Sequence, residues 1–217
     1  MIIAAKDAAN FLLSFFPDVP LDSDAYLEQG SRLQDALWPT VPLLPGALKL
    51  VHHLKKHNIP IAVATSTSRR NYDIKTAHLQ SLFECFEGKV ICGDHSHNMK
   101  GKPAPDIFIT TARDMLNRDV GYPGVAETDI HIHERGKGLV FEDALPGVQA
   151  GKRAGMSGNV SAALTVFLCL KFFIVVWVPD PNILKLADTV TEKADQMLDS
   201  LEKFIPEHWG LPPYDKL

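Results

Sequence analysis

The chain has 217 residues, of which 46% are hydrophobic and 22% are charged, a size and composition that suit one α/β domain. Its 22 basic and 26 acidic side chains give a net charge of −4, and no basic patch is interleaved with aromatic residues. We therefore expect no nucleic-acid partner. The three cysteines are odd in number and scattered, which argues against a disulfide framework. Residues 1–16 lack the basic start and the small-residue cleavage site of a signal peptide, so the cytoplasm is the expected location.

Hydrophobic periodicity predicts helices and strands that alternate along most of the chain. Segments 4–16 and 24–38 are predicted to be helices, and the proline-rich segment 39–45 is predicted to be a linker. The elements expected after it are a helix at 47–56, a strand at 59–65, a helix at 69–82, a strand at 89–92, a helix at 105–116, a strand at 138–141, a helix at 146–154, a strand at 175–178 and a helix at 191–204. This alternation indicates an α/β fold with a Rossmann-like parallel sheet and flanking helices.

Hydroxyl residues follow the strand predicted at 59–65, where the sequence reads Thr-Ser-Thr-Ser at 65–68. Hydroxyl groups and backbone amides in such a turn could donate hydrogen bonds to a phosphoryl oxygen. They could equally supply the N-cap of the helix that begins near Arg69. Both roles can coexist in one short turn.

A lysine lies between glycine and prolines in the segment 100–105, Lys-Gly-Lys-Pro-Ala-Pro. The prolines favour a short extended segment before a helix, which would hold Lys102 in a defined place. An ammonium group held in this way can act as a point charge against phosphate. The alternative is an ordinary solvated loop lysine.

Two adjacent carboxylates, Glu142 and Asp143, follow the short hydrophobic strand predicted at 138–141 and precede a Pro-Gly turn into a helix. In an open parallel sheet, ligands bind beyond the carboxyl ends of the strands. Two acids there can hold Mg²⁺, which prefers oxygen ligands and usually bridges to phosphate. The alternative is that they open the next helix, whose dipole favours acids near its N-terminus.

In this order, the three motifs resemble those of the haloacid dehalogenase superfamily. The region from residue 38 to the strand end is similar to the pseudouridine-5′-phosphatase branch, through Pro-Leu-Leu-Pro-Gly-Ala at 42–47, His-Asn-Ile-Pro at 57–60 and the Ala-Thr-Ser strand end at 64–66. The resemblance implies a Mg²⁺-dependent hydrolase of a small phosphomonoester, such as a nucleotide, a sugar phosphate or pseudouridine 5′-phosphate. It also implies phosphoryl transfer to an aspartate, followed by hydrolysis of the aspartyl-phosphate.

The same resemblance assigns roles to individual residues. Thr65 would bind the transferring phosphoryl group, with Ser66 as the alternative. Lys102 would act in catalysis by neutralising charge on the nucleophile and the phosphoryl oxygens, and Glu142 and Asp143 would position Mg²⁺. The physical logic is electrostatic, because fixed cations and donors stabilise the charge spread over the phosphoryl oxygens.

The chain departs from the family at its start. Family members begin with a strand carrying Asp-x-Asp, in which the first aspartate is the nucleophile, whereas residues 1–10 show helical spacing without this motif. Asp22 opens an Asp-Ser-Asp triplet, but no apolar strand precedes it, so we interpret Asp22 as a turn residue or helix N-cap. Segment 1–38 is interpreted as the remnant of a helical cap, and 39–217 as a core whose sheet has a gap at or near its centre.

Two hypotheses from different classes follow. One is a phosphatase whose activity is lost or impaired because the nucleophile is missing. The other is a truncated, non-catalytic product or scaffold that binds Mg²⁺ and phosphate without turnover.

A second departure is an apolar run from 160 to 178, which follows the Ala-Gly-Met of residues 154–156. Its length is close to that of a membrane-spanning helix, roughly 20 residues. Because Lys171 lies well inside the run, we interpret 157–173 as an insertion between core elements, and consider a membrane span the less favoured alternative.

Overall fold

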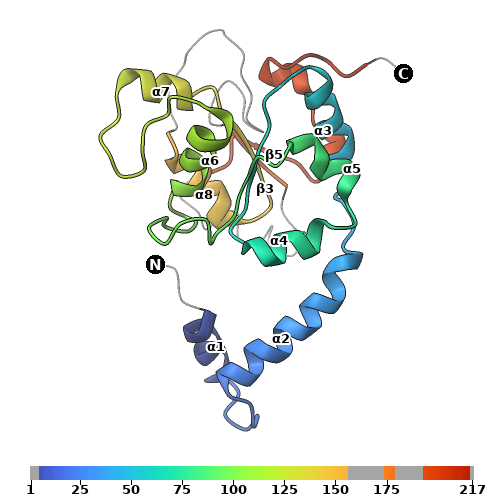
Figure 1. The fold of residues 1–217 in the computed structure, drawn as a ribbon, viewed down its shortest axis with the longest axis vertical. Coiled ribbons are helices and arrows are strands. Elements are labelled where there is room, and N and C mark those ends of the chain that lie inside the picture. The colour runs from blue at the N-terminus through green and yellow to red at the C-terminus, as the bar shows by residue number, and fades with distance from the viewer. Residues whose placement is uncertain (1–4, 156–173, 179–192, 216–217) are drawn as a thin grey trace.

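The computed structural model describes residues 5–155, 174–178 and 193–215 (Figure 1). Its helices are α1 (Ala5–Leu13), α2 (Ser23–Leu37), α3 (Ala47–Lys56), α4 (Arg69–Thr76), α5 (Gln80–Phe83), α6 (Asp106–Leu116), α7 (Asp129–Arg135) and α8 (Leu145–Arg153). Its strands are β1 (Val63–Ala64), β2 (Val90–Ile91), β3 (Leu139–Glu142), β4 (Ile174–Trp177) and β5 (Gln196–Met197). Short 3-10 turns lie at Trp38–Thr40, Glu84–Phe86, Leu201–Lys203 and Pro206–Trp209.

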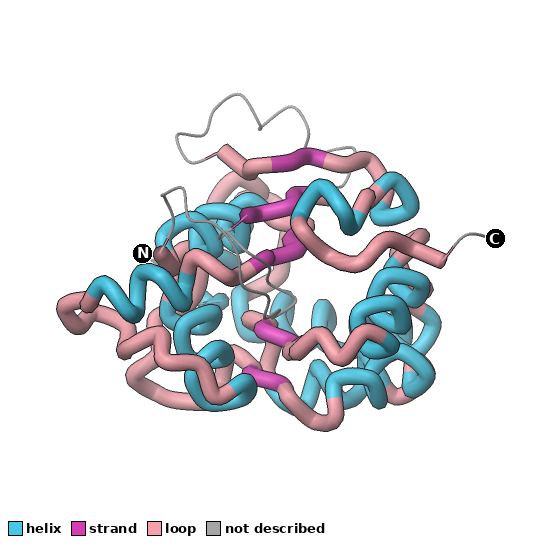
Figure 2. The backbone as a smooth tube through the Cα atoms, turned by 90° about the horizontal axis from the view of Figure 1, so that it is seen from above, coloured by secondary structure: helices cyan, strands magenta, loops and turns pink. Residues whose placement is uncertain are grey.

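The described strands form two parallel sheets, β1–β2 and β3–β4–β5 (Figure 2). Among the described residues, β1 pairs only with β2, and β3 pairs only with β4. One cavity is lined by Ala64 of β1 and by Phe141 and Glu142 of β3, so the break in the sheet lies between these two strands. The parallel α/β architecture is therefore confirmed, with a break near the middle of the row of strands.

The core packs between the strands and the helices that cover them. In α3, Leu50, Val51 and Leu54 are buried on one face, as expected for an amphipathic helix on a sheet. The ring of Phe204 packs edge-to-face on Phe141 of β3, with 5.0 Å between ring centroids. These contacts bring the C-terminal segment against β3.

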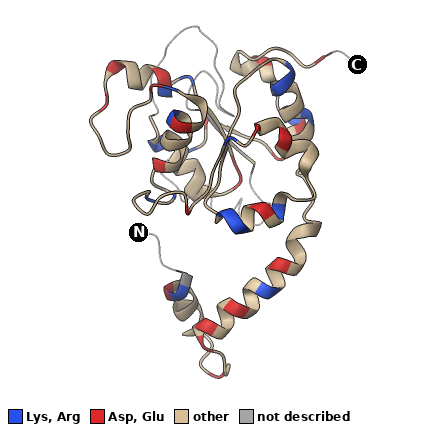
Figure 3. Ribbon diagram, in the orientation of Figure 1, with Lys and Arg blue, Asp and Glu red and all other residues tan. Residues whose placement is uncertain are grey.

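Helices α1 and α2 pack on each other and form a hairpin that extends away from the sheets (Figure 1). The side chain of Asp22 accepts a hydrogen bond from the backbone N of Ala25 at 2.8 Å, which confirms Asp22 as the N-cap of α2. Charged residues of both signs lie along α2 and α4 (Figure 3), and Arg70 of α4 pairs with Asp35 of α2 at 2.7 Å. Because exposed ion pairs contribute little to stability, this contact should affect the orientation of the hairpin more than the stability of the fold.

The prediction of a helix at 191–204 is wrong for residues 193–204, the part of that segment that the structure describes. Residues Gln196–Met197 instead form β5, which pairs with β4, and Leu201–Lys203 form a 3-10 turn. The apolar residues Ala194, Leu198 and Leu201 recur every three or four positions, which imitates helical periodicity. Pairing with the edge of β4 overrides this local pattern.

Other boundaries also differ from expectation. The helix predicted at 69–82 is divided into α4 and α5, and Thr76 at the end of α4 bonds back to the carbonyl of Tyr72 at 2.9 Å. Helix α7 was not predicted.

The insertion predicted at 157–173 lies outside the described residues. No helix within the described ranges has the length and apolar character needed to cross a bilayer.

We expect Gly46→Ala to be strongly destabilising. Gly46 has a φ of +86°, and a Cβ atom there would lie 2.5 Å from the backbone N of Glu202. Left-handed strain and a backbone clash together should lower the free energy of unfolding by about 2 kcal/mol. Gly30→Ala is the matched control, because a Cβ at this position in α2 meets nothing within 4 Å and should stabilise the helix by about 0.5–1 kcal/mol. Urea unfolding of both variants checks the prediction, which is contradicted if Gly46→Ala unfolds at the wild-type concentration.

Candidate functional site

A cavity of about 280 Å³ lies at the carboxyl ends of β1 and β3, at the break in the sheet. This is the edge of a parallel sheet at which ligands bind. Its lining residues are Leu44, Ala64, Thr65, Lys102, Phe141, Glu142, Asp143, Val178 and Leu201. Residues from three separate sequence motifs therefore meet in one place.

Lys102 bridges the two sides of the cavity. Its ammonium group donates to Glu142 Oε1 at the end of β3 and to the carbonyl oxygen of Ala64 in β1, the latter at 3.4 Å. The side chain is only 13% exposed, and Nζ lies 4.9 Å from the ring centroid of Phe108. Lys102 is thus held in place and is not a solvated loop lysine.

The loop that carries Lys102 is itself fixed. The backbone N of Lys100 donates to Asp106 Oδ2 at 2.9 Å, and Asp106 is the first residue of α6. The guanidinium of Arg153 donates to the carbonyl of Pro103 at 3.3 Å. These contacts position the lysine before any ligand is bound.

Glu142 is the last residue of β3, and its side chain is 8% exposed. Burial raises the pKa of its carboxyl, Lys102 opposes that rise, and the neighbouring charge of Asp143 adds to it. A Cβ on Gly147, in the first turn of α8, would lie 2.1 Å from the Glu142 carboxyl carbon. A side chain at this position would therefore displace the Glu142 carboxyl from its place beside α8.

Asp143 is the exposed neighbour of Glu142 and lines the same cavity. Helix α8 starts two residues further on, so the carboxylates lie at the strand end and not inside the first helical turn. Mg²⁺ usually binds one or two carboxylates together with waters and phosphate oxygens, and this pair fits such an ion. No cluster of three or more His, Cys, Asp or Glu suited to a metal occurs in the part of the chain that the structure describes.

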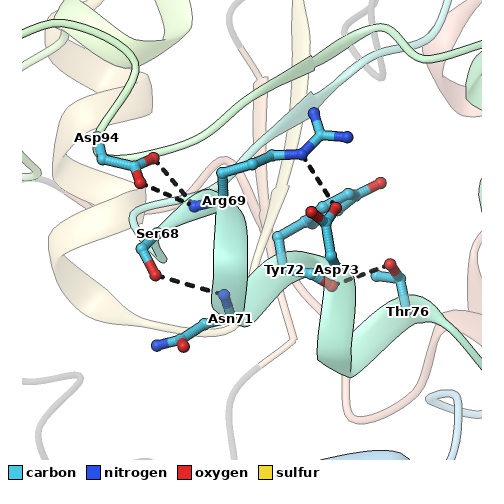
Figure 4. A network of polar contacts seen from close by, with 7 residues as sticks. All are labelled: Ser68, Arg69, Asn71, Tyr72, Asp73, Thr76 and Asp94. Carbon is cyan, nitrogen blue, oxygen red and sulfur yellow. Dashed lines mark hydrogen bonds and ion pairs between the residues drawn. The ribbon is translucent and has the colours of Figure 1, made fainter.

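In the turn after β1, one hydroxyl residue lines the cavity and another caps the following helix. Thr65 lines the cavity, and its Oγ1 accepts from the backbone N of Thr67 at 3.2 Å. Ser66 is exposed and is not among the lining residues. Ser68 accepts from the backbone N of Asn71 at 3.4 Å and caps α4, which confirms a helix N-cap in this turn (Figure 4).

Sequence reasoning missed Asp94, which follows β2. Both of its carboxylate oxygens accept from the backbone N of Arg69, the first residue of α4 (Figure 4). The signal in the sequence was a Gly-Asp pair directly after a predicted strand, the type of position where the other site motifs were found.

The buried carboxyl of Glu142 should make stability depend on pH. Because the pKa is raised in the folded state, that state holds the proton more tightly than the unfolded chain does. Stability is then greatest below the ordinary pKa of 4.5 and falls as pH rises through the higher folded-state pKa. In metal-free buffer, the stability of wild type relative to Glu142→Gln should therefore fall as pH rises through this window, because only wild type carries the titrating carboxyl.

Thermal unfolding of wild type and Glu142→Gln across this pH range measures the effect. Asp199→Asn is the control, because Asp199 is exposed and its pKa is lowered by a hydrogen bond from Lys203. A Glu142→Gln variant that is less stable than wild type at neutral pH and equal to it in acid would contradict the prediction.

Comparisons with known proteins find relatives along most of the chain. The family model of haloacid dehalogenase-like hydrolases matches residues 19–155. The chain is 40% identical to (DL)-glycerol-3-phosphatase 2 of Arabidopsis thaliana, over 88% of this chain and 65% of that protein. It is 39% identical to (DL)-glycerol-3-phosphatase 1, mitochondrial, of the same plant, over 88% of this chain and 52% of that protein. A Drosophila melanogaster protein named probable pseudouridine-5′-phosphatase is 32% identical over 99% of this chain and 78% of its own length.

The chain thus spans less than two thirds of the length of either plant glycerol-3-phosphatase. Pseudouridine-5′-phosphatases are among its relatives, as the resemblance predicts, and the glycerol-3-phosphatases match at higher identity. The match to the family model covers more than half of the chain and includes all three motifs. The chain belongs to the haloacid dehalogenase-like hydrolase family.

Proposed function

We propose that the chain carries the site of a Mg²⁺-dependent phosphomonoester hydrolase that binds phosphate beside Thr65 and Lys102. The observation that supports this proposal most is that Thr65, Lys102, Glu142 and Asp143 line one cavity, although they come from three motifs far apart in the sequence. A hydroxyl, an ammonium group and two carboxylates are the groups that a site for phosphate with a bridging Mg²⁺ needs.

Each residue has a separate task in this proposal. The Thr65 hydroxyl donates a hydrogen bond to a phosphoryl oxygen, and the Lys102 ammonium offsets the charge on the phosphoryl group. Glu142 and Asp143 hold Mg²⁺, which supplies further positive charge when it is bound. Burial of Lys102 and Glu142 strengthens these interactions, because little water is present to screen them.

The substrate we propose is a small phosphomonoester with a polyol, sugar or nucleoside group. A cavity of about 280 Å³ is near the lower end of the range for small-molecule sites, about 300 Å³. Relatives are named for glycerol 3-phosphate and for pseudouridine 5′-phosphate, which are therefore the first compounds to test. Segment 1–38, which contains the α1–α2 hairpin, is proposed to be part of a cap over the core at 39–217.

A second candidate function is a scaffold that binds Mg²⁺ and phosphate without turnover. The specific observation that favours it is the set of carboxylates around the cavity. Among the described residues, only Glu142 and Asp143 line the cavity with a carboxylate, and both are assigned to the metal. The described part of the chain then leaves no lining carboxylate to act as nucleophile.

The test is phosphate release from glycerol 3-phosphate and pseudouridine 5′-phosphate with and without Mg²⁺, with Asp143→Asn as the matched control. Mg²⁺-dependent turnover that Asp143→Asn lacks is the result expected of a hydrolase. Binding of Mg²⁺ and phosphate without turnover is the result expected of a scaffold. A folded chain that binds neither ligand contradicts both.

A further inference from the structure

We propose that Asp94 is a positioning residue for the phosphate site, because its carboxylate fixes the turn 65–68 that carries Thr65. The inference rests on the proposed function, in which this turn binds phosphate. Asp94 is exposed and does not line the cavity, so it would act through the turn and not through contact with substrate.

The first contact is made at the end of the turn. Asp94 Oδ1 and Oδ2 each accept from the backbone N of Arg69 at 3.0 Å (Figure 4). Arg69 begins α4, and the first amides of a helix have no partner within the helix itself. A carboxylate is also favoured there by the helix dipole. Asp94 therefore ties the start of α4 to the segment after β2.

The second contact is made in the middle of the turn, by the residue before Asp94. The backbone N of Gly93 donates to the carbonyl of Thr67 at 2.8 Å. A Cβ on Gly93 would lie 2.2 Å from the carbonyl oxygen of Ser66, so only glycine allows the two backbones to come this close. Gly93 and Asp94 thus hold the turn at two successive points.

These contacts reach the cavity through Thr67. The backbone N of Thr67 donates to Thr65 Oγ1 at 3.2 Å, while its carbonyl is held by Gly93. The orientation of the Thr65 hydroxyl therefore depends on where the clamped part of the turn lies. Without the Asp94 carboxylate, the Arg69 amide would donate its hydrogen bond to water, and the turn 65–68 would sample other conformations.

The experiment compares Asp94→Ala, Asp94→Asn and Asp73→Ala in the full chain. Asn keeps a carbonyl oxygen that can accept from Arg69, so Asp94→Asn should rescue most of the loss. Asp73→Ala is the matched control, because Asp73 is another exposed aspartate and bonds the side chain of Arg69, at 3.0 Å from Nε, instead of its amide (Figure 4). The readouts are hydrogen exchange of the Arg69 and Thr67 amides, the NMR signals of Thr65 during titration with inorganic phosphate and Mg²⁺, and thermal unfolding.

For Asp94→Ala we expect about fivefold faster exchange at Arg69 and about fivefold weaker phosphate binding, as for loss of a helix cap, with a fall of about 2–4 °C in the unfolding midpoint. Asp73→Ala should change neither. The inference is overturned if Asp94→Ala keeps wild-type exchange and Thr65 signals, if Asp73→Ala has the same effect, or if the loss of binding only follows a lower unfolding midpoint. If wild type binds no phosphate, the proposed function is overturned. The amide exchange rates and the Thr65 signals of the unliganded chain then test whether Asp94 fixes the turn 65–68.

Discussion

Replacing Lys102 with Met is expected to lower the free energy of unfolding by about 3 kcal/mol at pH 8. The Lys102 and Glu142 side chains are 13% and 8% exposed and pair with each other across the break in the sheet. Removing the ammonium leaves the Glu142 carboxylate buried without its partner, which costs more than the lost ion pair itself. Methionine keeps much of the lysine's length and apolar contact, so the loss should come from charge and not from a cavity.

A double-mutant cycle isolates this effect. Glu142→Gln combined with Lys102→Met should recover most of the stability, because neither side chain then carries a buried charge. The loss in Lys102→Met alone should also shrink as the pH falls, since the pKa of Glu142 is already raised by burial and rises further without Lys102. Urea unfolding at pH 5 and pH 8 measures all four proteins.

Lys55→Met is the matched control for this cycle, because Lys55 pairs with Glu87 on the surface, where the side chains are 42% and 53% exposed. Its unfolding midpoint should stay close to that of wild type. Equal losses of unfolding free energy in Lys55→Met and Lys102→Met would show that burial adds nothing to the effect of breaking the pair, and would contradict the prediction.

The parts of the site that could be predicted from sequence are those whose signal is local. A short apolar strand followed at once by Glu142 and Asp143 specifies both the strand and the position of the carboxylates at its end. The bounds of α3 agree with the prediction residue for residue, because its apolar face repeats with helical spacing and Gly46 marks its start. Lys102 could be predicted to be held because prolines restrict the loop around it.

What could not be predicted depends on contacts between segments distant in the sequence. Asp94 acts on the amide of Arg69, 25 residues earlier, and nothing near either residue in the sequence specifies that contact. The segment 191–204 has helical spacing, yet β5 forms there because the edge of β4 offers hydrogen-bond partners. The pairing of Lys102 with Glu142 likewise joins residues 40 positions apart. In each case the tertiary partner, and not local propensity, decides the outcome.

In the proposed function, the charges around the cavity would offset one another without a ligand and would still allow an anion to bind. Lys102 is paired with Glu142, so the buried charges largely offset one another before any ligand arrives. A phosphate entering alone would compete with Glu142 for Lys102 and would face the negative charge of Asp143. A phosphate entering with Mg²⁺ would meet a cation already associated with both carboxylates. The two ligands should therefore bind in a coupled manner.

Mg²⁺ is expected to tighten the binding of inorganic phosphate by about tenfold or more, equal to a coupling free energy of about 1.4 kcal/mol, and phosphate should tighten Mg²⁺ by the same factor. Isothermal titration of each ligand, with and without the other, measures both factors. Asp143→Asn should remove the coupling, because one of the two proposed metal ligands loses its charge.

Thr65→Val, which replaces the hydroxyl with a methyl group, should weaken phosphate binding about tenfold whether or not Mg²⁺ is present. Ser66→Ala is its matched control and should bind as wild type does, since Ser66 does not line the cavity. Phosphate affinity that is indifferent to Mg²⁺ would contradict a shared site, and a loss in Ser66→Ala equal to that in Thr65→Val would move the phosphate contact to the next residue.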